Sequence, residues 1–304
     1  MKEISKPMTS KPIKDAKVVF CGIVRDCGRH LARNLKRVED MRSRFSSLRF
    51  VLVENDSKDD TKEVLRALQE RDPTAIIDIS DFGTVTAPKK IKISSGVNPS
   101  YSHHRISKLS DYRNKYLELI ENEIGLESID WVIMLDWDIE SFCPESILST
   151  LEKSAQWDVA TANGRCKVGF TQDLYFDLFA YRALGQQGAC TEASIRGGRQ
   201  QVDKDLSHQE LVYVESAFNA LALYRAESLQ GLRYRAEPND DSRVEVWCEH
   251  VTFHRELAQR GFDRIVIDRS LHARYNTRAS ALVEMLRSVG RTIFGPVKSK
   301  ILRS

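Results

Sequence analysis

The chain lacks the sequence features that define several large classes of protein. Its longest unbroken apolar stretches, residues 18–24 (with one glycine) and 131–135, are far shorter than the roughly 20 residues that cross a bilayer. The basic N-terminal segment contains no apolar stretch of the kind that a signal peptide needs. Lys and Arg number 46 against 43 Asp and Glu, an imbalance too small to indicate nucleic acid as the main partner. We therefore expect a cytoplasmic protein, at most attached peripherally to the inner face of a membrane.

Several metal-binding and nucleotide-binding motifs are missing as well. The six cysteines are scattered without a C-x-x-C pair, which is typical of buried thiols in a reducing compartment. No glycine-rich phosphate loop follows the first apolar run, which argues against kinases and dinucleotide-dependent oxidoreductases. His250 and His254 have the spacing of zinc ligands on a helix, but the glutamate of H-E-x-x-H is absent and no third ligand lies nearby in the sequence. The pattern therefore disfavours a zinc hydrolase.

Apolar runs and helical spacings alternate along the first part of the chain. Residues 18–24 and 50–53 are continuous apolar runs, typical of strands buried on both faces, and residues 76–79 predict a third, short strand. Residues 31–45 and 59–70, between these runs, carry apolar side chains at helical spacing. This order predicts an α/β fold with a doubly wound, mostly parallel sheet, whose ligands collect at the carboxyl ends of the strands.

The remainder of the chain predicts further elements and one irregular region. Residues 105–123 and 247–260 predict helices. Strands are predicted at residues 131–135, 157–162, 212–224 and 265–267. The polar, glycine-bearing residues 163–212 predict a mobile region over a binding site.

Two aspartates, Asp136 and Asp138, directly follow the most apolar of these strands. Carboxylates at the end of a buried strand are costly unless a positive group is bound. Hard cations such as Mg²⁺ and Mn²⁺ take oxygen ligands, often one or two carboxylates together with substrate phosphates. The pattern favours a metal site, and the alternative is a pair of solvated aspartates in a turn.

These aspartates belong to a set of motifs that resembles the GT-A glycosyltransferases. The sequence VENDSKDDT at residues 53–61 resembles the family's V-D-D-G-S-x-D-x-T motif, with Glu54 and Asn55 at the two aspartate positions and Asp56 in place of glycine. CGIVRD at residues 21–26 is similar to the family's first strand and nucleotide-contacting turn, and MLDWD at residues 134–138 matches its metal-binding D-x-D motif. Order and spacing agree with the family across residues 17–145.

The resemblance implies a GT-A, Rossmann-like fold and a set of site residues. The nucleotide-binding residues would be Arg25, Asp26, Glu54, Asn55, Asp56 and Asp136. Asp136 and Asp138 would hold Mn²⁺ or Mg²⁺. His272, close to Arg274 in the sequence, resembles the C-terminal metal- or phosphate-contacting residue of such enzymes, and the alternative is a surface histidine.

Three shorter elements resemble the fungal capsule mannosyltransferase group of GT-A enzymes. They are YFDLFAYR at residues 175–182, VESAFNA at 214–220 and VWCEHVTFH at 246–254. Glu249, in the last element, stands where the resemblance implies the base that takes the proton from the acceptor hydroxyl in an inverting enzyme. The alternative is a glutamate that the helix dipole favours at a helix start.

The implied activity is metal-dependent transfer of a hexose from a UDP- or GDP-sugar to a glycan or lipid-linked acceptor, as in polysaccharide biosynthesis. A sugar-nucleotide pyrophosphorylase-like nucleotidyltransferase and a non-catalytic glycan-binding protein stay open as alternatives. The predicted organisation is a flexible leader (1–16), a nucleotide-sugar-binding half (17–160), an acceptor-binding half (161–275) and a basic amphipathic tail (276–304). The tail would contact an anionic membrane surface or pack on the sheet as a helix.

Overall fold

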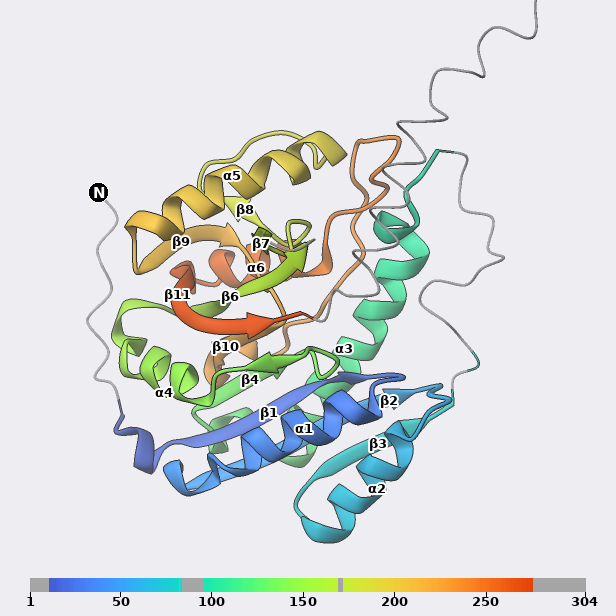
Figure 1. Cartoon of the computed structure of the whole chain (residues 1–304), viewed down its shortest axis with the longest axis vertical. Coiled ribbons are helices and arrows are strands. Elements are labelled where there is room, and N and C mark those ends of the chain that lie inside the picture. The colour runs from blue at the N-terminus through green and yellow to red at the C-terminus, as the bar shows by residue number, and fades with distance from the viewer. Residues whose placement is uncertain (1–10, 82, 84–95, 169–171, 276–304) are drawn as a thin grey trace, which may run out of the picture.

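The computed structural model describes residues 11–81, 83, 96–168 and 172–275, in which one mixed sheet carries helices on both faces (Figure 1). The helices are α1 (Gly28–Glu39), α2 (Thr61–Arg71), α3 (His103–Glu123), α4 (Pro144–Glu152), α5 (Glu192–His208) and α6 (Glu249–Gln259). The strands are β1 (Lys17–Val24), β2 (Ser47–Asn55), β3 (Ile76–Ser80), β4 (Trp131–Leu135), β5 (Ser141–Phe142), β6 (Val159–Val168), β7 (Gln172–Tyr175), β8 (Arg182–Ala183), β9 (Leu211–Ser216), β10 (Leu221–Arg225) and β11 (Ile265–Arg274). Short 3-10 helices include η1 (Ile13–Asp15) and η2 (Arg42–Arg44).

The strands follow the order β3-β2-β1-β4-β10-β6-β11-β9-β8 across the sheet. β3, β2, β1 and β4 pair in parallel. β10 lies antiparallel between β4 and β6, and β11 pairs in parallel with β6. The carboxyl ends of β2, β1, β4 and β6 therefore share one edge, and the predicted α/β fold with a mostly parallel sheet is confirmed. The single strand predicted at residues 212–224 is instead two strands, β9 and β10, which β11 and β6 separate.

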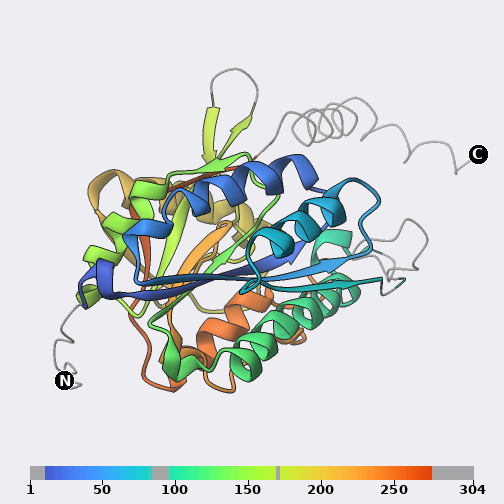
Figure 2. The same ribbon diagram turned by 90° about the horizontal axis from the view of Figure 1, so that it is seen from below.

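Burial on both faces explains the continuous apolar runs of the central strands. In β1, Val18 and Phe20 pack into one core with side chains of α1, α2 and α4. Val19 and Cys21 pack into a second core with side chains of α3, α5 and α6. Figure 2 shows α1 and α2 on one side of the sheet and α3 and α6 on the other. Both faces exclude water, so polar side chains gather where the strands end.

Residues 163–212, which the sequence predicts to be irregular, contain regular secondary structure. The structure forms the end of β6, the strands β7 and β8, and α5 within this range. α5 begins with a capping box between Thr191 and Ser194, and it buries Ile195, Val202 and Leu206. Three buried apolar residues among many polar ones give too weak a helical pattern to stand out in the sequence.

The structure describes only some of the predicted segments, and one predicted boundary falls inside a strand. Residues 1–10 of the predicted leader and the whole predicted tail, residues 276–304, lie outside the described residues. The last part of the predicted leader forms η1, and Ala16 is buried. The boundary at residue 160 falls within β6, so the two predicted halves share one continuous sheet. No helix within the described ranges is long and apolar enough to span a membrane.

The turn after β4 lies against β1 at Gly22. A Cβ atom at Gly22 would lie 2.2 Å from the Leu135 carbonyl oxygen and 2.7 Å from the Trp137 ring. The Trp137 ring is buried, and the Asn34 side-chain amide of α1 donates to the Trp137 carbonyl oxygen at 3.2 Å. The absence of a side chain at position 22 therefore fixes where this turn, with its two aspartates, sits on the sheet.

We expect Gly22→Ala to lower the free energy of unfolding by about 1–3 kcal/mol, because a methyl group has no room between β1 and the turn. Chemical denaturation measures the change. Gly197→Ala is the matched control, since a Cβ there meets nothing within 4 Å and alanine is favoured over glycine in a helix by about 0.5–1 kcal/mol. A Gly22→Ala protein as stable as the wild type would contradict the close approach.

Two buried histidines on α6 belong to the core. The ring nitrogens of His254 lie 3.0 Å from the Ser216 hydroxyl and 2.8 Å from the Tyr224 hydroxyl. The His250 ring stacks on Phe218, with the ring centroids 3.9 Å apart. Burial lowers the pKa of His254 to about 3 and holds the pKa of His250 well below its usual value. Both rings are therefore neutral core side chains at pH 7.

Acid should destabilise the protein through these rings, because the unfolded chain binds protons below pH 6.5 that the folded chain does not bind. Each neutral histidine then costs about 1.4 kcal/mol of unfolding free energy per pH unit below a pKa of about 6.5. His250→Phe keeps an aromatic ring against Phe218 and should lose about 2 kcal/mol less than the wild type between pH 7 and pH 5. Urea unfolding at both pH values measures this, and equal losses would show that His250 titrates normally.

Candidate active site

Asp136 lies at the carboxyl edge of the sheet, between β4 and β10. Its backbone N–H donates to the Ala220 carbonyl oxygen at 2.8 Å. Asn219 and Ala220, in the turn that enters β10, have φ values of 58° and 75°. This left-handed region is uncommon for residues other than glycine, and strained backbone persists only where the surrounding contacts hold it. Strain is therefore stored next to the first aspartate of the D-x-D motif.

A buried arginine connects Asp136 with Glu249. Arg113, on α3, is only 6% exposed. Its Nη2 lies 3.6 Å from Asp136 Oδ1, and its Nε lies 3.3 Å from Glu249 Oε1. The guanidinium also lies over the rings of Phe218 and Tyr234, at 5.0 Å and 5.7 Å from their centroids. The structure thus brings the predicted metal ligand and the predicted base, which is buried at the start of α6, to one cation.

A third carboxylate, Asp177, joins this group. Its backbone N–H donates to Asn219 Oδ1 at 3.1 Å, and Asn219 Nδ2 donates to the Gly164 carbonyl oxygen at 2.9 Å. Burial raises the pKa of Asp177, and the charge of Glu249 adds to the rise. Asp177 lies within the Y-F-D motif at residues 175–182, but no spacing in the sequence indicates that this segment returns to β4. Nothing in the sequence indicates a functional role for Arg113, because it is one polar residue on a predicted helix.

Burial and repulsion between carboxylates both raise pKa values in this cluster, and burial is the larger cause. Burial raises the pKa of Asp136 to about 7; Arg113 opposes the rise, whereas Asp138 and Asp177 add to it. The pKa of Asp138 is also raised, because its carboxyl group is partly desolvated although the residue is exposed; its own backbone N–H and the charge of His30 on α1 oppose the rise. A bound cation would relieve this repulsion and favour the ionised carboxylates.

Hydrogen bonds join the loop that follows β1 to the loop that follows β2. Asp26, with a φ of 44°, donates its N–H to the Ser57 hydroxyl at 3.0 Å, and its Oδ1 accepts the Lys58 N–H at 2.7 Å. Arg25 Nε lies 3.5 Å from Asp26 Oδ2. The predicted nucleotide-contacting turn therefore has a fixed shape at the end of β1.

Side chains of the second loop also occupy amide groups at the start of α1. The Gly28 N–H donates to Asp59 Oδ2 at 3.0 Å, and the Cys27 N–H donates to the Thr61 hydroxyl at 2.9 Å. A Cβ atom at Gly28 would lie 2.0 Å from Asp60 Oδ1. Amides at a helix N-terminus are a common phosphate site, and here the chain's own side chains fill that role.

Polar atoms without partners gather at the end of β2. Glu54 and Asn55 are buried, and Asp56 has a φ of 54° at the position where the resembling motif has glycine. Glu54 Oε1 accepts the Ser57 N–H at 2.6 Å, and Glu54 Oε2 lies 3.9 Å from Lys62 Nζ. Among the described residues, Glu54 Oε2, Asn55 Nδ2 and Asp56 Oδ2 have no hydrogen-bond partner. Buried polar atoms are normally paired, so three consecutive residues with unpaired atoms indicate a polar ligand.

His272 does not join a three-residue metal group in the structure. It is exposed on β11, where its backbone pairs with Asn163 of β6. Across residues 11–81, 83, 96–168 and 172–275, no three His, Cys, Asp or Glu side chains lie close enough together to hold a metal ion. Metal binding by Asp136, Asp138 and His272 therefore stays a prediction.

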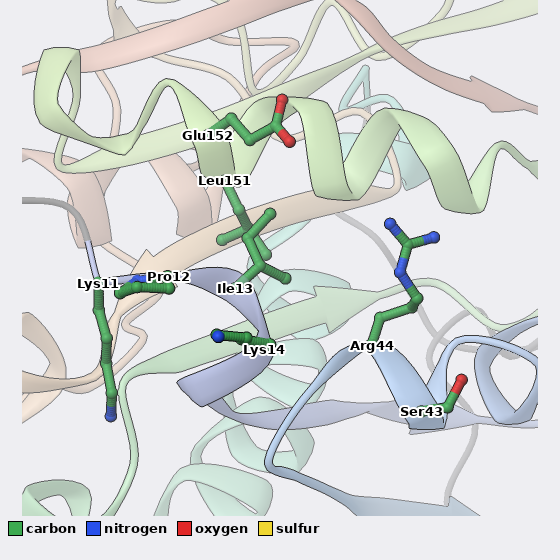
Figure 3. A pocket seen from close by; sticks show the side chains of 8 residues that line it. All are labelled: Lys11, Pro12, Ile13, Lys14, Ser43, Arg44, Leu151 and Glu152. Carbon is green, nitrogen blue, oxygen red and sulfur yellow. The ribbon is translucent and has the colours of Figure 1, made fainter.

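A groove of about 520 Å³ lies at the opposite, amino-terminal edge of the sheet, and Figure 3 shows the side chains that line it. It is lined by Lys11, Pro12, Ile13, Lys14, Ser43, Arg44, Leu151 and Glu152, which come from η1 and its flanks, η2 and α4. β1, with eight residues at about 3.3 Å each, separates this edge from the carboxylates. The groove is therefore not part of the carboxylate site.

Two solved structures are distantly similar to this chain. PcManGT, a mannosyltransferase from Pyrobaculum calidifontis in complex with GDP-Man and Mn²⁺, matches with a TM-score of 0.49 and 10% identity, over 95% of this chain and 66% of that chain. TarS 1-349 from S. aureus matches with a TM-score of 0.45 and 12% identity, over 91% of this chain and 65% of that chain. The match thus spans just under two thirds of the PcManGT chain and of the TarS 1-349 fragment, and likenesses at this level assign no function. No curated protein sequence matches the chain.

A family model, in contrast, matches most of the chain. The family described as cryptococcal mannosyltransferase 1 matches residues 17–256. The match includes the ends of β1, β2 and β4, together with Arg113, Asp177 and Glu249, whereas His272 lies beyond it. The resemblance to fungal capsule mannosyltransferases is confirmed: the chain belongs to the cryptococcal mannosyltransferase 1 family.

Proposed function

We propose that the protein transfers a hexose from a nucleotide-sugar donor to a hydroxyl group of a glycan or lipid-linked acceptor, with the help of a divalent cation. The observation that carries the proposal is the chemistry of one sheet edge, where unpaired polar atoms end β2 and mutually repelling carboxylates follow β4. The unpaired polar atoms suit the hydrogen-bonding edge of a nucleobase. The carboxylates suit a cation that binds a diphosphate. Membership of a mannosyltransferase family favours mannose as the hexose.

The proposed donor lies across the end of β1. β1 separates β2 from β4, so the two groups are about 10 Å apart at the spacing of neighbouring strands. A nucleoside diphosphate could therefore contact Glu54, Asn55 and Asp56 with its base and reach Asp136 with its phosphates. Arg25, at the end of β1, would add positive charge near the phosphates, while Asp26 holds the loop in shape.

Asp136 and Asp138 would hold the cation. Carboxylate oxygens are the ligands that Mn²⁺ and Mg²⁺ prefer, and these ions often take one or two carboxylates and complete their shell with water and substrate phosphates. A third protein ligand is therefore not required, and His272 stays a candidate for that role. When bound, such a cation supplies charge neutralisation to the departing diphosphate. Arg113 keeps Asp136 in position from the other side.

Glu249 would accept the proton of the acceptor hydroxyl. A general base must lie within hydrogen-bond reach of the proton that it takes. Glu249 shares the Arg113 cation with Asp136, which supports a position next to the proposed leaving group. Asp177 is the neighbouring carboxylate and the second candidate for the same step.

The two alternatives fit this geometry less well. A pyrophosphorylase-like nucleotidyltransferase would present the amides after β1 to phosphates, but Asp59 and Thr61 already occupy amides there. A non-catalytic glycan-binding protein needs neither a group of three carboxylates that repel one another nor the strained backbone at Asn219 and Ala220 that supports them. Both observations support the transferase.

Asp138→Asn should abolish cation-dependent donor binding, because the site loses an anionic ligand oxygen. The fold should stay intact, because Asp138 is exposed. Thermal shifts with GDP-mannose and with UDP-glucose, each with and without Mn²⁺, measure the binding. Asp40→Asn, at the far end of α1, is the matched control and should behave as the wild type. Undiminished transfer by Asp138→Asn in excess chelator would refute the metal assignment.

Glu249→Gln should lower kcat by about 10²–10⁴-fold, as expected for a lost general base, while donor binding survives. Nucleotide release from the donor, measured beside the thermal shift, separates the two effects. Asp177→Asn is assayed in parallel, and a larger loss of kcat in that variant would move the base role to Asp177. Unchanged turnover in Glu249→Gln would leave Glu249 as a structural residue at a helix start.

A further inference from the structure

An aromatic pair, Phe176 and Tyr275, stands out because one of its rings remains open to solvent. The ring centroids are 3.9 Å apart, and the ring planes are inclined by 32°. Phe176 is 40% exposed, although full burial of a phenylalanine would contribute about 1.5–3 kcal/mol of stability. Single exposed apolar residues are common on protein surfaces, so the position of the pair decides its meaning.

The strand register puts Phe176 level with the turn after β4. Ala222 of β10 pairs with Met134 of β4 on one side and with Thr161 of β6 on the other. Gly164, three residues beyond Thr161 on a strand that runs in the same direction as β4, is therefore level with that turn. The Phe176 N–H donates to the Gly164 carbonyl oxygen at 3.2 Å. The pair thus lies at the same height on the sheet as the carboxylates.

Tyr275 connects the pair electrostatically with the carboxylate cluster. Its backbone N–H donates to the Arg165 carbonyl oxygen at 3.0 Å, which fixes it beside β6. Burial raises the pKa of the Tyr275 phenol, and the charges of Asp136, Asp177 and Asp138 raise it further. The phenol is therefore within electrostatic reach of all three aspartates.

We propose that Phe176 and Tyr275 form a stacking platform for one pyranose ring of the acceptor glycan. This inference rests on the proposed function, since it assigns the pair to the acceptor of the same transfer reaction. A pyranose ring presents a face of C–H groups, and the electron-rich face of an aromatic ring attracts such groups. Asp177, the residue next to Phe176, is electrostatically coupled to Glu249, so a sugar held there would lie beside the carboxylate cluster.

The sheet order favours the acceptor over the nucleobase as the occupant. β6 is four strands from β2, which corresponds to about 19 Å at the spacing of neighbouring strands. A donor whose base contacts the end of β2 and whose phosphates reach Asp136 spans only β1 and β4. The part of the sheet edge at β6, where the aromatic pair lies, therefore remains available to the acceptor.

The test compares binding of glycan and of donor in the full-length protein. Mannotriose, maltotriose and cellotriose are titrated by saturation-transfer NMR, and GDP-mannose and UDP-glucose with Mn²⁺ are followed by thermal shift. We expect Phe176→Ala to weaken binding of the preferred trisaccharide about tenfold, with donor binding unchanged. Phe176→Tyr should retain glycan affinity. Tyr213→Ala, which removes a similarly exposed aromatic ring on β9, should have no effect.

The outcomes separate the platform from the proposed function. Equal trisaccharide binding by Phe176→Ala and wild type, or no trisaccharide binding by the wild type, would overturn the platform. Loss of donor binding in Phe176→Ala with glycan binding retained would also overturn it and assign the pair to the nucleobase. A wild type that binds trisaccharide through Phe176 but neither donor would instead refute the transferase and leave the platform standing as a glycan-binding site.

Discussion

A guanidinium buried between two carboxylates is the interaction on which the candidate site depends. Arg113 comes from α3, whereas its partners Asp136 and Glu249 come from the end of β4 and the start of α6. Removing one member of a buried ion pair leaves an uncompensated charge and costs roughly 3–5 kcal/mol. The cation therefore fixes the distance between segments that the sequence keeps far apart. Its aromatic neighbours, Phe218 and Tyr234, limit its movement further.

The same cation does not neutralise the whole cluster. Asp138 and Asp177 add negative charge, and the pKa of Asp136 is raised to about 7 by burial together with these neighbours. The strained turn at Asn219 and Ala220 holds the backbone of Asp136 and Asp177 in place despite this repulsion. The surplus of negative charge on these carboxylates favours a cationic ligand, which is the physical reason for the proposed metal.

The sheet order divides the molecule's carboxyl edge into two chemically different sides. On the β2 side, one buried polar atom each of Glu54, Asn55 and Asp56 has no hydrogen-bond partner among the described residues. On the β6 side, the aromatic pair of Phe176 and Tyr275 is partly open to solvent. Hydrogen-bonding groups suit a base and aromatic faces suit a sugar ring, so one sheet can serve donor and acceptor, with the carboxylates between them.

The sequence by itself determined the local elements. Apolar runs predicted the central strands, and the motifs at residues 53–61 and 134–138 predicted the polar ends of β2 and β4. The elements at residues 175–182, 214–220 and 246–254 predicted the family. It did not reveal α5, whose apolar residues are too sparse, or the reversal of β10 between β4 and β6. Only the tertiary structure decided that Arg113 pairs with Asp136 and that Asp177 and Tyr275 lie within electrostatic reach of it. Periodicity records which face of an element is buried, whereas the meeting of distant polar side chains depends on strand order and register.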